Sequence, residues 1–201
     1  MQTLHIAPAQ METRIARFRD LQPLEIQKNS AVPEVARDVV YARKLLSVIG
    51  LEGKGKTPIN NAAPIIGAAG LTMTLAVCPP GQGPGLHAHQ QTFETFTVLQ
   101  GQFEFAWNDQ GENHVVLEMF DTISVPPGVC RAFRNVGSTE GILQVLITGG
   151  VHDMNDIAFS AKAADTIEAV APGALAHFKQ AGFSFNAARL ETVGLGQEAK
   201  A

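Results

Sequence analysis

The sequence contains little charge and few cysteines. Charged residues make up only 17% of the 201 residues, the formal net charge is −4, and lysines and arginines do not cluster among aromatic residues. Because nucleic-acid binding depends on a basic surface, we expect no nucleic-acid partner. The two cysteines, Cys78 and Cys130, are too few for a disulfide framework and lack CxxC spacing, so we expect two small buried thiols.

Long apolar segments are also missing. No apolar run approaches the ~20 residues that a membrane-spanning helix needs. Residues 1–10 lack the basic start and the following apolar stretch that are typical of a signal peptide. We therefore expect a cytoplasmic protein without a membrane partner.

The chain does contain enough apolar residues for one substantial core, since 45% of it is hydrophobic. This length and composition predict one globular domain built from three regions. Residues 1–64 are expected to form an N-terminal extension that is partly helical, with helix expected in 11–21 and 33–49 and a loop rich in glycine and proline following it. Residues 151–201 are expected to form a C-terminal extension with two short helices, the first capped by Ser160.

Residues 65–150 between these extensions have the pattern of a β-structure. From Leu71 to Cys78 apolar residues alternate with others until Pro79-Pro80-Gly81 ends the strand. Further short strands are predicted at 94–99, 103–107, 114–119, 121–125, 131–135 and 142–148, separated by turn residues. Several short strands at even spacing indicate an all-β sandwich or barrel.

One stretch of this β-region carries candidate metal ligands. His87 and His89 are two residues apart, so on a strand both imidazoles point to the same face, and Glu94 adds a carboxylate nearby. Two histidines and one carboxylate are the ligand set of non-haem iron sites, and the same set suits Mn, Ni, Co or Zn. We therefore predict a divalent first-row metal at these three residues, with iron favoured.

The same stretch resembles the first signature of the cupin superfamily through Gly81, His87, His89, Glu94 and Gly101. A second stretch is similar to the second cupin signature through Pro126, Gly128 and Asn135. The resemblance implies an all-β double-stranded β-helix, that is, a single cupin jelly-roll barrel over residues 65–150. It also implies a homodimer, because cupins of this kind are often dimers.

Two positions depart from the family pattern. Phe120 stands where the family usually has glycine, and Arg131 stands where it usually has a third histidine, the fourth metal ligand. A guanidinium keeps its charge and cannot ligate a metal, so Arg131 needs another partner. One alternative is an ion pair with Glu94 in a metal-free pocket, and the other is a clamp that holds an anionic group of a substrate. His114 is a further candidate ligand, although a lone histidine on a strand more often faces solvent.

Strand alternation places several aromatic residues inside the barrel. Phe96 shares the face of Glu94, Phe133 shares the face of Arg131, and Phe105 and Trp107 share a face of the intervening strand, so these four are predicted to line a pocket. The leading functional prediction is a dioxygenase-like, metal-dependent oxidoreductase that acts on a small, acidic organic substrate. The alternatives are a metal-free cupin that binds or senses a small molecule, and a cupin isomerase or hydrolase.

Overall fold

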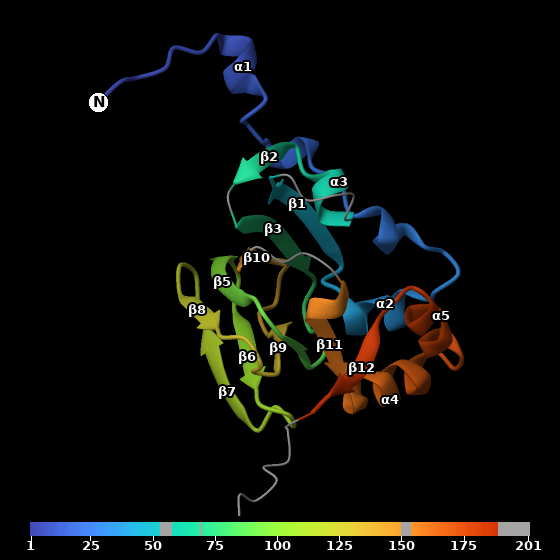
Figure 1. The fold of residues 1–201 in the computed structure, drawn as a ribbon. Coiled ribbons are helices and arrows are strands. Elements are labelled where there is room, and N and C mark those ends of the chain that lie inside the picture. Colours follow the sequence, from blue (N-terminus) through green and yellow to red (C-terminus); the bar gives the residue numbers. More distant parts are fainter. Residues whose placement is uncertain (53–57, 69, 150–153, 189–201) are drawn as a thin grey trace, which may run out of the picture.

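The computed structural model describes residues 1–52, 58–68, 70–149 and 154–188, which form two six-stranded sheets packed face to face (Figure 1). The first sheet has the order β2 (Ile65–Ala68), β1 (Lys44–Leu51), β3 (Leu71–Cys78), β10 (Gly141–Thr148), β5 (Phe93–Gln100) and β8 (Thr122–Val125). The second has the order β12 (Ser184–Ala187), β11 (Ile157–Ser160), β4 (His87–His89), β9 (Arg131–Asn135), β6 (Phe103–Trp107) and β7 (Asn113–Leu117). This arrangement is a double-stranded β-helix, and the predicted fold class is confirmed.

An aromatic cluster fills the space between the sheets. Phe96, Phe103, Phe105 and Phe133 are buried with the aliphatic residues of β3 and β10. The Phe96 ring lies 5.1 Å from that of Phe105 and 5.3 Å from that of Phe133, in tilted and edge-on arrangements that aromatic rings prefer. Burying each of these side chains contributes about 1.5–3 kcal/mol, so this cluster holds the two sheets together.

Both extensions contribute strands as well as helices. The helix expected within 33–49 ends early, because α2 spans Glu34–Val40 and the chain then enters β1, which pairs antiparallel with β3. Leu46 and Val48 of β1 are buried, so pairing this segment with the edge of β3 stabilises the fold more than a longer α2 would. In the C-terminal extension, β11 pairs antiparallel with β4 and β12 pairs parallel with β11.

The remaining helical elements surround the sheets. These are α1 (Pro8–Glu12), α3 (Pro58–Ala62), α4 (Ala161–Val170), α5 (Ala174–Gln180) and the short 3-10 turns η1 (Phe18–Asp20), η2 (Glu25–Lys28) and η3 (Met154–Asp156). In the segment 11–21, helix is limited to the end of α1 and to η1. The two predicted C-terminal helices are confirmed, and the Ser160 hydroxyl caps α4 by accepting a hydrogen bond from the Ala163 amide at 3.2 Å.

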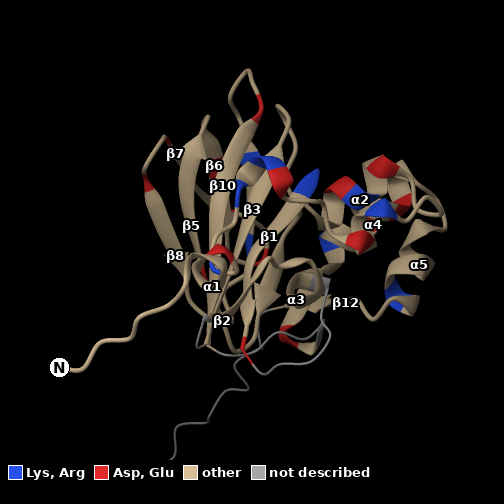
Figure 2. Ribbon diagram, turned by 90° about the horizontal axis from the view of Figure 1, so that it is seen from above, with Lys and Arg blue, Asp and Glu red and all other residues tan. Residues whose placement is uncertain are grey.

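The outside of the molecule carries charges of both signs. Acidic and basic residues alternate over α2 and α4 and the neighbouring loops (Figure 2). None of the helices in the described part of the chain is long and apolar enough to cross a bilayer.

Phe120 adopts a left-handed backbone conformation. Its φ is +76°, and its side chain is 73% exposed in the turn before β8. A residue with a Cβ is strained there by about 1–2 kcal/mol, whereas glycine is not. The turn therefore keeps the geometry that suits the usual family glycine, although phenylalanine occupies it.

Candidate metal centre

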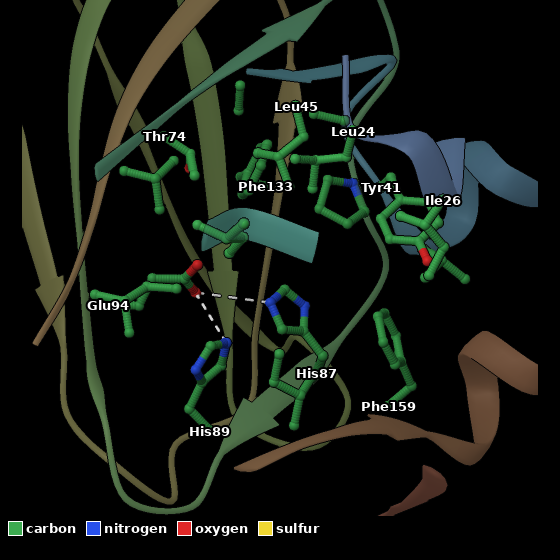
Figure 3. Close-up of a pocket in the computed structure, with 18 of the residues that line it drawn as sticks. Leu24, Ile26, Tyr41, Leu45, Thr74, His87, His89, Glu94, Phe133 and Phe159 are labelled. Atoms are coloured by element: carbon green, nitrogen blue, oxygen red, sulfur yellow. Dashed lines mark ion pairs between the residues drawn. The ribbon is translucent and has the colours of Figure 1, made fainter. Parts of the chain in front are cut away.

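The three predicted ligands come together between the two sheets. His87 and His89 lie on β4 of the second sheet, Glu94 lies on β5 of the first, and all three side chains are buried. The ligating atoms lie within 4.8 Å of one another. His87 Nε2 and His89 Nε2 are each 3.7 Å from Glu94 Oε2, and Figure 3 shows both imidazoles turned toward this carboxylate.

The outer nitrogen of His87 is held by the backbone. Its Nδ1 lies 2.8 Å from the Gly85 carbonyl oxygen, which can only accept a hydrogen bond. Nδ1 must therefore carry the proton. Burial lowers the pKa of His87, with only partial compensation from Glu94, so the ring is neutral near pH 7 and Nε2 has a free lone pair.

The outer nitrogen of His89 is held by a relay from the C-terminal extension. Thr92 Oγ1 donates to Asp156 Oδ2 at 2.6 Å, and so it accepts from His89 Nδ1 at 2.8 Å. Asp156 also accepts from the Gln91 amide at 2.6 Å and lies 3.2 Å from His89 Nδ1. Burial alone would raise the pKa of Asp156, but these hydrogen bonds lower it to about 2. Carboxylate–histidine contacts of this kind orient metal ligands.

The result is a centre at which three hydrogen-bond acceptors converge. The separations of 3.7 Å are too long for hydrogen bonds, and the protons of both rings are on the far nitrogens. A tetrahedral site with bonds of ~2.1 Å has ligand separations of ~3.4 Å, so each histidine–carboxylate separation needs to close by only a few tenths of an ångström. The donor set therefore fits a divalent metal ion.

Arg131 is paired with Glu94, as in the first of the two alternatives for this residue. It lies on β9 directly opposite His87 and is only 1% exposed. Its Nε donates to Glu94 Oε2 at 2.9 Å, and its Nη1 donates to the Val129 carbonyl at 3.2 Å. Nη2 lies 2.8 Å from the same Oε2 but without the alignment of a hydrogen bond. Burial favours the protonated form of Glu94, but the charge of Arg131 opposes it, and the pKa of Glu94 lies well below its usual range.

A cavity of about 380 Å³ opens beside the histidines and Glu94. Its wall is mostly apolar and is built by the barrel and by both extensions (Figure 3). The barrel contributes Thr74, Ala76, His87, His89, Glu94, Phe133, Val145 and Ile147, and the rest of the chain contributes Leu24, Ile26, Val40, Tyr41, Ala42, Leu45, Ile59, Pro84, Ile157, Phe159 and Phe183.

Only one of the four predicted lining aromatics borders this cavity. Phe133 borders it. The rings of Phe96 and Phe105 pack against the Phe133 ring in the core, and Trp107 on β6 pairs with Arg131 on β9. Phe96 and Phe105 are therefore core packing residues rather than lining residues, and Trp107 does not border the cavity, because strand alternation predicts which face a side chain takes but not its depth in the barrel. Arg131 is also absent from the cavity wall, and His114 is exposed on β7.

Sequence reasoning missed the contributions of the extensions. Tyr41, Phe159 and Phe183 border the cavity, and Asp156 orients His89, although all four lie outside the stretch that resembles cupins. Tyr41 lies in a segment that was expected to be helical, and the other three gave no signal of a role at the site. No pattern linked them to the histidines.

Comparisons with known proteins agree with this description. Residues 74–147 match the family model of the cupin domain. A search of the curated proteins finds no significant match.

Similar solved structures share low identity with the chain. A chain from the crystal structures of the DMSP lyases RdDddP and RnDddQII is 21% identical over 59% of this chain and 53% of that one, with a TM-score of 0.46. This chain thus spans about half the length of that relative. A Klebsiella pneumoniae protein with a double-stranded beta-helix domain is 22% identical over 44% of this chain and 72% of that one, with a TM-score of 0.39. A predicted oxalate decarboxylase from Thermotoga maritima is 26% identical over 38% of this chain and 64% of that one, with a TM-score of 0.36.

The matched segment contains all three candidate ligands and Arg131, and it coincides with the central strands of the double-stranded β-helix. Residues 74–147 of the protein therefore form a cupin domain.

Proposed function

We propose that this protein is a metal-dependent cupin that binds and oxidises a small organic molecule, in the manner of a dioxygenase. The observation that carries the proposal is the convergence of His87 Nε2, His89 Nε2 and Glu94 Oε2 beside a largely apolar cavity. A first-row metal held there, with iron favoured, supplies Lewis-acid and one-electron redox chemistry.

The residues around the centre have separate tasks. The Gly85 carbonyl and the Thr92–Asp156 relay keep the two Nε2 atoms unprotonated. Arg131 keeps Glu94 ionised and fixes its orientation. The apolar wall excludes water from a bound molecule and strengthens electrostatic interactions in the cavity.

The charges of the site favour an acidic substrate. Arg131 and Glu94 cancel each other and imidazoles that ligate a metal are neutral, so Asp156 is the one remaining negative charge among these groups. A divalent metal therefore leaves a net positive charge of one at the centre. A carboxylate or enolate on the substrate would neutralise it.

The second candidate is a metal-free module that binds or senses a small molecule. The direct Arg131–Glu94 ion pair favours it, because the guanidinium already satisfies Glu94 without a metal. Under this alternative the cavity binds its ligand through apolar contacts, and no reaction takes place.

Oxygen consumption separates the two candidates. The full chain, reconstituted with Fe(II), is tested against small carboxylates, 1,3-dicarbonyls and aromatic diols. The His89→Ala variant should lose the activity, and His114→Ala, which alters an exposed histidine, should retain it. Binding of a compound that stabilises both the iron-loaded and the chelator-treated protein, without oxygen uptake, would instead support the binding module.

A further inference from the structure

The cavity lies between two apolar cores. One wall belongs to the core of the barrel, which includes Ala76 and Phe133. The other wall belongs to a second core that is packed from α2, α4, α5 and β11, and it borders the cavity through Val40, Phe159 and Phe183. The extensions therefore shape the cavity as much as the barrel does.

The polar side chains of the wall belong to the barrel. Apart from Tyr41, the polar residues that line the cavity all lie on barrel strands, and they are Thr74, His87, His89 and Glu94. The Tyr41 hydroxyl oxygen is enclosed by protein atoms and is out of reach of a bound molecule. Figure 3 shows Ile26 and Tyr41 on the side opposite Glu94, with His87 between them. Among the described residues, the part of the wall built by the extensions thus offers a bound molecule no polar side chain.

The volume of the cavity limits the size of a bound molecule. At the ~30 Å³ that a water molecule occupies in the liquid, 380 Å³ corresponds to about a dozen non-hydrogen atoms. A carboxylate group accounts for three of them, which leaves room for a tail of about nine carbons. Water beside the extensions finds few hydrogen-bond partners among the side chains, so an apolar tail displaces it favourably.

We propose that the cavity binds a carboxylic acid with a single apolar tail of about nine carbons, which lies against the extensions and ends near Ile26. The acid group faces the histidine centre, and this half of the assignment rests on the proposed function. The tail contacts only apolar side chains and needs no metal.

The test compares two series of straight-chain probes on the full chain. Acids of four to fourteen carbons are titrated by calorimetry into Mn(II)-loaded protein, and uncharged primary alcohols of the same lengths into chelator-treated protein. Each added methylene should raise the affinity about fourfold until the chain has about ten carbons, and longer chains should gain less than twofold in total. The acid 8-hydroxyoctanoate should bind at least about fivefold more weakly than octanoate, because its hydroxyl would be buried without a partner.

Ile26 provides variants that alter the far end of the cavity. It lies half-buried on η2 and packs against the second core. Ile26→Trp fills this end and Ile26→Ala enlarges it. Because protein interiors are close-packed, the chain length at which the affinity stops rising should shorten and lengthen, respectively, by about two carbons. Val35→Ala alters an exposed side chain of α2 outside the cavity and should leave this chain length unchanged.

Three results would overturn the proposal. These are affinities that do not depend on chain length, equal binding of octanoate and 8-hydroxyoctanoate, and a limiting chain length that Ile26→Ala does not move. The alanine variant decides the last point even if Ile26→Trp does not fold.

The two series also separate this inference from the proposed function. If the alcohols show the limiting chain length and Ile26→Ala moves it while the protein binds no metal, the tail site stands and the metal-dependent function fails. If metal binds and small acids support oxygen consumption while neither series depends on chain length, the function stands and the tail site fails.

Discussion

Replacing Arg131 by methionine leaves the buried Glu94 carboxylate without its partner. The guanidinium Nη2 and Glu94 Oε2 are 2.8 Å apart, and at an effective dielectric constant of ~20 two unit charges at this distance attract by about 6 kcal/mol. The desolvation of both groups offsets part of this attraction, so we expect Arg131→Met to lower the free energy of unfolding by about 3–5 kcal/mol in metal-free protein. Urea unfolding followed by circular dichroism, with chelator present, measures the change.

A matched control is available on the surface. Arg134 Nη2 lies 2.9 Å from Glu104 Oε1, nearly the same distance, but this arginine side chain is 56% exposed. Arg134→Met should cost less than ~1 kcal/mol because water screens the exposed pair.

The double variant Arg131→Met with Glu94→Leu removes both buried charges and should recover most of the lost stability. If Arg131→Met does not fold, Arg131→Lys keeps the charge and should cost less than the methionine replacement. A cost for Arg131→Met no larger than that for Arg134→Met, with additive single and double variants, would refute the buried ion pair.

Three further predictions concern other parts of the molecule. Phe120→Gly should raise the free energy of unfolding by about 0.5–1 kcal/mol, because glycine relieves the backbone strain at φ +76° but adds conformational freedom to the unfolded chain. Phe120→Ala keeps the Cβ and should not stabilise the protein, so a stabilising alanine would contradict this reasoning. Burial raises the pKa of Cys78 to about 12 and also raises that of Cys130, so native protein at pH 8 should show no thiol that reacts rapidly with a disulfide reagent, whereas denatured protein should show two. Burial lowers the pKa of His87, so the stability that its neutral form contributes is complete above the unfolded pKa of ~6.5 and is lost as pH falls toward the folded pKa. Metal-free His87→Gln should therefore lose less stability than the unmodified protein between pH 6.5 and 5. If the free energies of unfolding of the two proteins fall in parallel over this range, the result would count against this assignment.

The parts of the site that lie close together in the sequence could be predicted from it. His87 and His89 share a strand, and the period of two places both imidazoles on one face wherever that strand lies. Glu94 is the second residue of the next strand, which follows a short turn, so its approach to the histidines is also local. The spacing of short alternating segments predicted an all-β sandwich or barrel, and the resemblance to the two cupin signatures specified the double-stranded β-helix.

The remaining parts depend on contacts between distant segments. Asp156 lies 64 residues from Thr92, and Tyr41 reaches the cavity only because β1 joins the edge of β3 and brings the end of α2 alongside. The direction of Arg131 was also undetermined, since residue type and strand face allow either a Glu94 partner or a bound anion. Side-chain torsions and long-range packing decide such choices, and strand periodicity carries no information about them.

Metal content tests the central claim most directly. Untagged protein, stripped with chelator and then reconstituted with Fe(II) or Mn(II), should bind one ion per chain by elemental analysis. His89→Ala should bind none, and Asp156→Asn should bind the ion about 10- to 100-fold more weakly, because its relay orients His89. Protein that takes up no first-row metal after reconstitution, or that binds one equally well without His89, would contradict the metal centre.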